Sequence, residues 1–333
     1  MEQSFSNEFF KFLNHEQKNL LPFISKITEE DKELFKSNLD SLVTKSKKDH
    51  PPDFENSFEY IRLYFNSGRF RGLKFYDDQN LIMFALEKKK KPHFKLYKPL
   101  GGHGLQKFTE IITLLSSITN YPIQIVCLDN EHVKILKKQR SIKVKNIKEF
   151  KYYIYDLNKL TGLSGNQWKT VRQKITAFNR NYPKLKIEHL TPQNYNKTIH
   201  FIGAWRRELL ANRGLSYANL EKNKFAAQYY SDKNDFENIW ATVYSLDTRV
   251  VAFQLLYRLG PDAAAHAIGL ADTKIKGLSE FAQIHIWEQL HDSGIRYIND
   301  GPSWRPELEK YKLKFNPITS QQVFECKVQG IKN

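Results

Sequence analysis

Cysteine is scarce in this sequence, which argues against stabilisation by disulfides and against a metal site built from cysteines. The chain has 333 residues but only two cysteines, Cys127 and Cys326, which lie in apolar, strand-like surroundings. Their spacing provides neither a disulfide framework nor a set of metal ligands. We therefore expect two buried thiols, no bound metal and a cytoplasmic protein, because the cytoplasm is reducing.

The sequence also lacks an uninterrupted apolar segment long enough to cross a membrane. Its longest uncharged run, residues 111–128, is broken in the middle by two serines, a threonine, an asparagine, a tyrosine and a proline. A lone lipid-facing helix disfavours such a break, so the run predicts a helix, a turn and a buried strand. The first residues lack the basic start and apolar core of a secretory signal. We expect no transmembrane segment.

Acidic residues are outnumbered by basic ones. The chain contains 52 Lys and Arg against 36 Asp and Glu, which gives a net charge of +16. The excess is concentrated in residues 132–186, where 15 basic residues face only Glu149 and Asp156. Such a stretch attracts phosphate groups, either on nucleic acid or on an anionic lipid surface. The alternative is a solvated basic face, which we prefer for the separate lysine run at residues 88–91.

Apolar residues are abundant enough for two folded cores. The sequence is 41% apolar and 14% aromatic, and a chain of this length is typical of about two domains. Residues 138–150 are rich in lysine and lack an apolar period, so we interpret them as an exposed connection. This interpretation places an N-terminal domain at residues 1–145 and a C-terminal domain at residues 146–333.

One order of predicted elements occurs twice, about half a chain apart. In each copy a strand leads into a glycine-containing turn, a helix, a second strand and an aspartate, which is Asp129 in the first copy and Asp300 in the second. The first strand of each copy is also the third strand of a predicted antiparallel meander. The meander strands are at residues 73–76, 81–86 and 94–97, and again at 240–246, 250–258 and 263–270. Repetition of a whole folding unit constrains the architecture strongly.

Helical periodicity flanks both predicted sheets. It predicts two short helices within residues 1–48, a long amphipathic helix at 164–182, and further helices through 205–210 and at 220–229. This is an α+β order. It resembles the GNAT acyltransferase fold in both halves, so we expect two tandem GNAT-like domains, each a mixed, mostly antiparallel sheet flanked by helices.

Several motifs in the second half resemble one known family. They are residues 153–157, 167–178, 182–183 and 190–192, together with the closing stretch at 308–317. They are similar to the soluble C-terminal domain of phosphatidylglycerol lysyltransferases, and the resemblance covers roughly residues 70–325. It implies a tandem GNAT fold in which an aminoacyl-tRNA donates its amino acid to a lipid or another small acceptor. Full-length lipid-modifying members also carry a membrane-embedded domain, and we expect none within these 333 residues.

Transfer from an aminoacyl ester makes modest chemical demands, because the ester is already activated. The enzyme must position the acceptor, relay a proton and stabilise the developing oxyanion. No covalent nucleophile is required. The sequence agrees with this, since it shows no Ser-His-Asp arrangement, catalytic cysteine motif or metal-ligand cluster. No cofactor is expected beyond the donor itself.

Two residues are predicted to act at the reacting centre. Asp300 follows the second repeat's helix at the point where a GNAT fold opens its cleft, so it can bind an acceptor amine or assist proton transfer. Trp304 follows four residues later and can line that cleft. The competing interpretations are a turn aspartate before Gly301-Pro302 and a packing tryptophan. His266 lies on a central strand, where satisfied core histidines are common, and it is assigned no role.

A second group of residues is predicted to contact phosphate on the donor. In Lys169, Arg172 and Arg180, charge concentration and family motif coincide. Lys274, Lys276 and Gly277 precede a helix whose N-terminal N–H groups can form an anion cradle. Lys312 and Lys314 alternate with apolar residues, so a strand would place both on one face. For these lysines a solvated surface is the competing interpretation.

The leading hypothesis is a cytoplasmic aminoacyl-tRNA-dependent transferase, with peripheral contact to an anionic lipid surface as a further expectation. An acyl-CoA-dependent N-acyltransferase is the first alternative, although the turn before the second helix offers only Gly277 for a pyrophosphate. A module without catalysis that binds RNA or anionic membrane through residues 132–186 is the second. The sequence leaves open the donated amino acid, the acceptor and the oligomeric state.

Overall fold

The computed structural model describes residues 23–45, 57–65, 70–77, 80–87, 93–100, 104–118, 122–213, 227, 238–303 and 305–331. The chain forms two compact units, each described separately below. Unit 1 comprises Met1–Lys48, Glu55–Phe150 and Gln322–Asn333, and unit 2 comprises Asp49–Phe54 and Lys151–Gln321. The end of the chain therefore belongs to the first unit.

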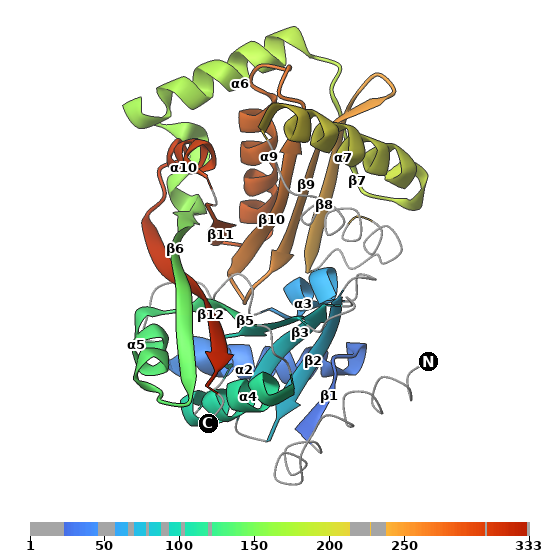
Figure 1. The fold of residues 1–333 in the computed structure, drawn as a ribbon. Coiled ribbons are helices and arrows are strands. Elements are labelled where there is room, and N and C mark those ends of the chain that lie inside the picture. The colour runs from blue at the N-terminus through green and yellow to red at the C-terminus, as the bar shows by residue number, and fades with distance from the viewer. Residues whose placement is uncertain are drawn as a thin grey trace. The chain divides into compact units, whose positions relative to one another are not determined.

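Unit 1 is a mixed sheet covered by helices (Figure 1). Its strands lie in the order β1-β2-β3-β4-β5-β12-β6. The pairs from β1 to β4 are antiparallel, β4 and β5 are parallel, and β12 is antiparallel to β5. The elements are β1 (Ile24–Lys26), α2 (Lys32–Lys45), α3 (Phe58–Phe65), β2 (Phe70–Tyr76), β3 (Leu81–Glu87), β4 (His93–Tyr97), α4 (Gly104–Ile118), β5 (Ile123–Leu128), α5 (Asn130–Lys138), β6 (Ile142–Asp156) and β12 (Thr319–Gly330).

The core of unit 1 lies between this sheet and helices α4 and α5. Strand side chains alternate between the two faces of a sheet. In β3, Ile82, Phe84 and Leu86 face the cluster that contains Phe108 of α4 and Leu136 of α5, and all of them are buried. The other face meets α3, where Tyr60 makes an edge contact with Tyr97 of β4. Both faces of the sheet are covered, which explains why β3 is apolar along nearly its whole length.

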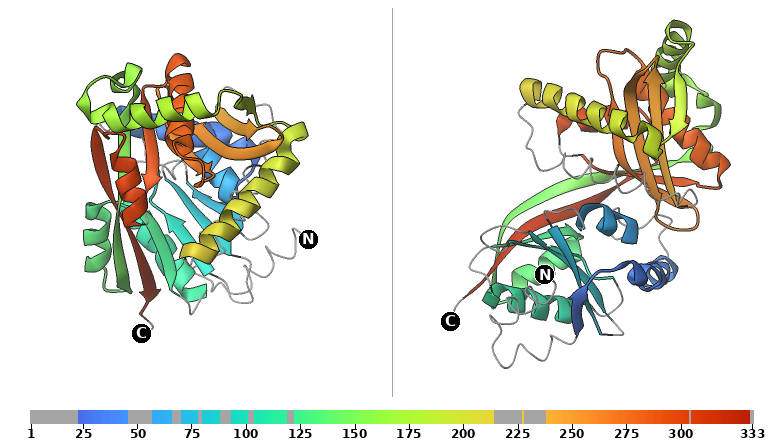
Figure 2. Two further views of the ribbon diagram at one scale, coloured as in Figure 1. Left: turned by 90° about the horizontal axis from the view of Figure 1, so that it is seen from above. Right: turned by 90° about the vertical axis from the view of Figure 1, so that its right-hand side faces the viewer.

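Unit 2 repeats the same plan. Its sheet order is β6-β11-β10-β9-β8-β7, and both β4–β5 of unit 1 and β10–β11 of unit 2 are parallel pairs joined through a helix. Helices α7 and α9 lie on opposite faces of the unit 2 sheet (Figure 2). The elements are α6 (Lys169–Asn181), β7 (Lys186–His189), α7 (Pro192–Arg213), β8 (Ile239–Leu246), β9 (Arg249–Arg258), β10 (Ala263–Ala271), α9 (Leu278–Asp292), β11 (Tyr297–Pro302) and α10 (Pro306–Leu313).

The predicted α+β class, with mostly antiparallel sheets and flanking helices, is confirmed. Both predicted meanders, the helix and strand that follow each, and the long helix of residues 164–182 are present with small shifts of their ends. In α6 the predicted apolar stripe faces inward through Val171 and Phe178. The first predicted helix of the N-terminal region lies outside the described residues, and of the predicted helix at 220–229 the structure describes only residue 227.

Two predictions of local structure are wrong. Residues 142–150 are not a connection but the first part of strand β6, which reaches Asp156. Residues 312 and 314 do not lie on a strand, because Pro306 begins helix α10 and Lys312 lies in its last turn. Proline at the first helical position and acidic residues in the first turn favour a helix start, and they outweigh the alternating pattern that follows.

Besides α10, the elements β1, α5 and β12 have no counterpart in the predictions. Helix α5 begins after Asp129, whose carboxylate accepts the backbone N–H of His132 at 2.9 Å, and it ends with Lys137 and Lys138. Among the described residues, no helix combines the length and apolar content needed to cross a membrane.

Candidate functional site

The predicted catalytic aspartate lies on β11 in unit 2, next to a histidine of the neighbouring parallel strand. Ala265 of β10 pairs with Asn299 of β11, so the register places His266 beside Asp300. His266 Nδ1 lies 3.7 Å from Asp300 Oδ1, and Lys312 Nζ lies 3.7 Å from Asp300 Oδ2. The Asp300 side chain is 12% exposed.

His266 is fixed in one tautomer by two glutamines. Its Nε2 lies 2.7 Å from Oε1 of Gln254 on β9, and its Nδ1 lies 3.0 Å from Nε2 of Gln283 on α9. Nε2 therefore carries the proton and donates it to Gln254, while Nδ1 accepts from Gln283. Burial, aided by the positive charge of Lys312, lowers the pKa of His266 to about 3. The ring stays neutral at physiological pH.

Lys312 holds the end of β11 in place. Its ammonium donates to the carbonyl oxygens of Asp300, Gly301 (2.9 Å) and Pro302 (3.5 Å). The Tyr155 hydroxyl donates to the Lys312 carbonyl at 3.0 Å, which ties β6 to the same turn. Burial lowers the pKa of Lys312, and the nearby Asp300 carboxylate opposes that effect. Lys312 is only 4% exposed, so its ammonium faces these backbone oxygens and the Asp300 carboxylate inside the unit.

The carboxyl of Asp300 ionises with difficulty. Burial raises its pKa to about 6, although Lys312 acts in the opposite direction. The corresponding residue of the first repeat, Asp129, has a different environment. Burial also opposes its ionisation, but hydrogen bonds from His132 and the charges of His132 and Lys98 outweigh burial and hold the pKa of Asp129 well below its usual range. Of the two repeat aspartates, only Asp300 has a pKa suited to proton transfer near neutrality.

A second buried carboxylate lies in the first turn of α9. Glu280 is 4% exposed, and it accepts from Lys174 of α6 at 2.6 Å and from Lys314 at 3.2 Å. Burial opposes ionisation of Glu280, but the two lysines outweigh it and lower its pKa. The Tyr311 hydroxyl donates to the Ser279 carbonyl at 3.0 Å. This cluster joins α6, α9 and α10, and it neutralises part of the positive charge expected at the start of α9.

The residues predicted to contact phosphate have different surroundings in the structure. Lys169 and Arg180 are exposed on α6, and Lys276 is exposed before α9. Lys274 pairs with Glu208 at 3.2 Å. Nη1 of Arg172 donates to the carbonyls of Leu163 and Gly165, so Arg172 supports the turn before α6.

Gly277 has a packing role that the sequence did not reveal. Its φ of 85° requires glycine, and a Cβ atom built there would lie 2.5 Å from the carbonyl oxygen of Lys174. The turn is thus closed against the backbone of α6. Trp304, the other predicted catalytic residue, lies outside the described residues.

The residues missed by sequence reasoning are the partners of Asp300. His266 was assigned no role, and Gln254 and Gln283 were not considered. The available signal was a polar residue inside the apolar run Ala263–Ala271, but its meaning depends on the register with β11. Among the described residues, no group of three or more His, Cys, Asp or Glu side chains could hold a metal ion.

Comparisons with known proteins give a family and a fold. The profile of the family described as "Phosphatidylglycerol lysyltransferase, C-terminal" matches residues 66–327. No curated protein sequence matches the chain. A conserved protein of unknown function from Bacteroides thetaiotaomicron is similar in structure, with 16% identity, a TM-score of 0.68, and coverage of 92% of this chain and 99% of that one.

Two further solved structures show the same fold. L-PGS from Bacillus licheniformis is 13% identical, with a TM-score of 0.59, and the match covers 93% of this chain and 94% of that one. A tandem GNAT protein from the clavulanic acid biosynthesis pathway is 9% identical, with a TM-score of 0.57, and the match covers 93% and 99%. These similarities confirm the predicted tandem GNAT fold and the predicted family resemblance.

Proposed function

Because the chain belongs to the family of phosphatidylglycerol lysyltransferase C-terminal domains, we propose that it transfers an aminoacyl group from an aminoacyl-tRNA to a lipid, or to another small acceptor. Membership of this family makes the chain an acyl- or aminoacyltransferase of GNAT fold. The observation that carries the finer proposal is the nearly buried carboxyl of Asp300, held between the neutral His266 and the buried Lys312.

The reaction requires one proton to move between two oxygens. The acceptor hydroxyl attacks the ester carbonyl of the donor, a new ester bond forms, and the bond from the carbonyl carbon to the tRNA oxygen breaks. The Asp300 carboxylate accepts the proton of the attacking hydroxyl, and the resulting carboxylic acid returns it to the departing tRNA oxygen. With an amine acceptor, the same carboxylate binds the ammonium group and removes a proton before attack.

The surroundings of Asp300 support this role. A group that both accepts and returns a proton works best when its pKa is near the working pH, and the pKa of Asp300 is raised to about 6 by burial. His266 does not compete for the proton, because burial lowers its pKa to about 3. Lys312 holds the backbone of residues 300–302 through three carbonyls, which keeps the carboxyl in place.

The test is incubation of the protein with a pool of radiolabelled aminoacyl-tRNAs and a cell extract, followed by phase partition of the label. We expect label to leave the tRNA and appear in a lipid or small-molecule fraction. Asp300→Asn should lower the rate by about 100-fold or more, because it removes the proton acceptor with little change of shape. Label that stays wholly on tRNA with every amino acid would contradict the proposal.

An acyl-CoA-dependent N-acyltransferase is the second candidate, favoured by the fold shared with an acetyltransferase of the GNAT family from Colwellia psychrerythraea (12% identity, TM-score 0.51). The position of Gly277 speaks against it, because α6 closes on the turn where a pyrophosphate would have to approach. Thermal unfolding decides between them. A shift of the melting temperature with acetyl-CoA or a long-chain acyl-CoA, but not with charged tRNA, would favour this candidate.

A further inference from the structure

Unit 1 carries a group of exposed cations that have no acidic partner. We call it the basic face and define it by residues of α5, of β6 and of the turn between them: Lys134, Lys137, Lys138, Arg140, Lys143, Lys145 and Lys148. No ion pair links any of these seven to an acid among the described residues. In unit 2, by contrast, many cations are paired: Lys174 and Lys314 with Glu280, Lys274 with Glu208, Arg249 with Asp272 and Arg296 with Asp156.

Local structure explains why these side chains point outward. Helix α5 buries Val133 and Leu136 in the core of unit 1, so the lysines between and after them face solvent. In β6, the five consecutive residues 145–149 are all exposed, so this part of the strand presents both of its faces to solvent. Asn146 has a φ of 51°, a left-handed conformation that interrupts the regular alternation of side chains there.

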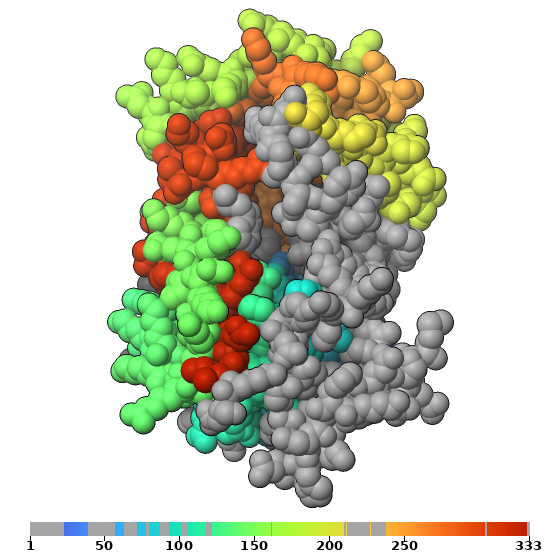
Figure 3. All heavy atoms as spheres, in the orientation of Figure 1, coloured from blue at the N-terminus to red at the C-terminus, as the bar shows by residue number. Residues whose placement is uncertain are grey.

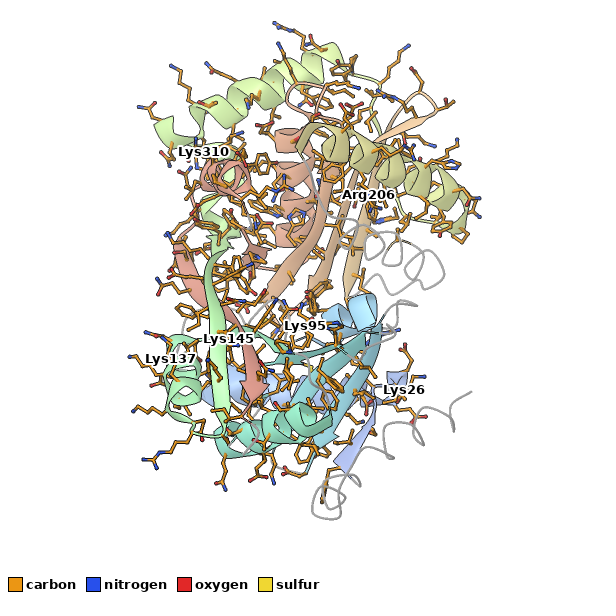
Figure 4. The ribbon with its side chains drawn as sticks, in the orientation of Figure 1. Lys26, Lys95, Lys137, Lys145, Arg206 and Lys310 are labelled. Atoms are coloured by element: carbon orange, nitrogen blue, oxygen red, sulfur yellow. The ribbon has the colours of Figure 1, made fainter. Side chains whose placement is uncertain are left out.

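The basic face forms one continuous stretch of surface. Figure 3 shows the residues of α5 and β6, in green, gathered on one side of unit 1. Figure 4 labels Lys137 on α5, at the outer edge of the view, and Lys145 on β6, and both residues are exposed. Along the chain from residue 130 to residue 150 the acidic residues are Glu131 and Glu149, and Glu149 already accepts a hydrogen bond from Gln322 at 2.9 Å. A strongly positive potential remains.

We propose that the basic face binds the phosphate backbone of RNA, and that its ligand is the body of the donor tRNA. This inference rests on the proposed function for the identity of the RNA. It also places a donor contact in unit 1, apart from the α6 residues for which phosphate contact was predicted. The seven cations can each contact a phosphate, and such contacts do not depend on base sequence. Binding the tRNA body away from its aminoacylated end requires contacts of this kind.

The composition of the face favours RNA over a membrane surface. Attachment to a bilayer is usually strengthened by an apolar face inserted between headgroups. The large exposed apolar side chain within the basic face is Ile147, and it is only 38% exposed. Within β6 the exposed residues 145–149 include polar and charged side chains but only one large apolar side chain, Ile147, that could enter a bilayer.

The experiment measures binding of fluorescently labelled, uncharged tRNA by anisotropy across a range of salt concentrations. The variant is Lys137→Glu/Lys143→Glu/Lys145→Glu. We expect it to bind at least about tenfold more weakly, and the slope of log K against log salt to fall by about two to three, since each phosphate contact contributes about 0.7–0.9. The matched control, Lys36→Glu/Lys197→Glu/Lys310→Glu, changes the same charge at exposed, scattered lysines outside residues 132–186 and should bind nearly as the wild type does.

Further arms separate the possible failures. Asp300→Asn should bind tRNA as the wild type does, because it affects transfer only. If the wild type binds tRNA but the basic-face variant binds it equally well, the inference is overturned while the proposed function stands. If the variant loses binding to phosphatidylglycerol vesicles but keeps tRNA binding, the face is a membrane surface and the inference is wrong. If tRNA binding depends on the face but no transfer occurs, the inference stands and the proposed function fails.

Discussion

Asp300 and His266 lie side by side, yet burial moves their pKa values in opposite directions. The pKa of Asp300 rises from 3.8 to about 6, and that of His266 falls from 6.5 to about 3. Burial disfavours the charged form in both cases. The titratable groups around the pair are Lys312, which faces both residues, and the phenols of Tyr155 and Tyr311. Both phenols stay neutral, because burial raises their pKa well above 10.0. At a slightly acidic pH, below about 6, the Asp300 carboxyl and the His266 imidazole are therefore both largely uncharged.

These two shifts predict opposite effects on stability. Between pH 3.8 and 6 the folded protein keeps a proton on Asp300 that the unfolded chain releases, so this contribution is lost as the pH rises. Below pH 6.5 the unfolded chain takes up a proton on His266 that the folded protein refuses, so this contribution is lost as the pH falls. Between about pH 4 and 6 the two contributions nearly cancel in the wild type.

Single substitutions should expose each contribution. Relative to wild type, the unfolding free energy of Asp300→Asn should rise between pH 4 and 6 by up to about 1.4 kcal/mol per pH unit, because His266 is then unopposed. That of His266→Gln should fall over the same range, because Asp300 is then unopposed. Urea denaturation at three pH values measures both slopes. If the difference in unfolding free energy between each variant and the wild type does not change with pH, the two groups do not titrate as their burial requires.

At the scale of elements, the close approach of α6 and α9 depends on a single glycine. A Cβ atom at Gly277 would lie 2.5 Å from Lys174 O and 3.0 Å from Phe178 Cβ, and neither the backbone nor a buried ring can move aside easily. Gly294, at the other end of α9, has nearly the same φ of 83°, but no atom lies within 4 Å of the same point. The two glycines differ in packing, not in backbone conformation.

This pair provides an internal control for a packing prediction. Gly294→Ala should lower the unfolding free energy by about 1 kcal/mol, the cost of a left-handed alanine. Gly277→Ala carries the same backbone cost and must also separate α6 from α9, so we expect about 3 kcal/mol or more. Denaturant unfolding of both variants measures the difference. Equal losses would mean that α6 shifts at no cost.

The elements also show what sequence patterns can predict and what they cannot. The meanders and the helix after each were predicted because their apolar periods are local. The first part of β6 was misread as a connection because its pattern is polar, and its strand conformation comes from pairing far along the chain. The strand expected at Lys312 and Lys314 was wrong because alternation over four residues is weaker evidence than the proline that begins α10.

The same limit applies to the candidate site. Asp300 could be predicted from the repeat, since the second copy ends there. Its partner His266 could not, because adjacency across two parallel strands depends on their register, which a single sequence does not contain. The buried state of Lys312 was equally hidden, since only the turn of α10 brings its ammonium to the carbonyls at the end of β11.

At the scale of the molecule, the chain returns to its first unit at its end. Strand β12 begins at Thr319, but the residues from Gln322 onward belong to unit 1. There β12 is antiparallel to β5, and Cys326 and Val328 are fully buried in the unit 1 core. The stability of unit 1 therefore depends on residues some 200 positions after the end of β5, which makes its contacts unusually non-local.

This connectivity predicts which unit a change near the C-terminus will damage. Val328→Asp places a carboxylate in the apolar core of unit 1, and an unpaired buried charge costs several kcal/mol. Hydrogen exchange should then accelerate in β2–β5, while β8–β11 of unit 2 remain protected. The control is Lys327→Asp, at the adjacent exposed position, which should leave exchange nearly unchanged in both units. Faster exchange confined to β8–β11 would contradict the assignment of β12 to unit 1.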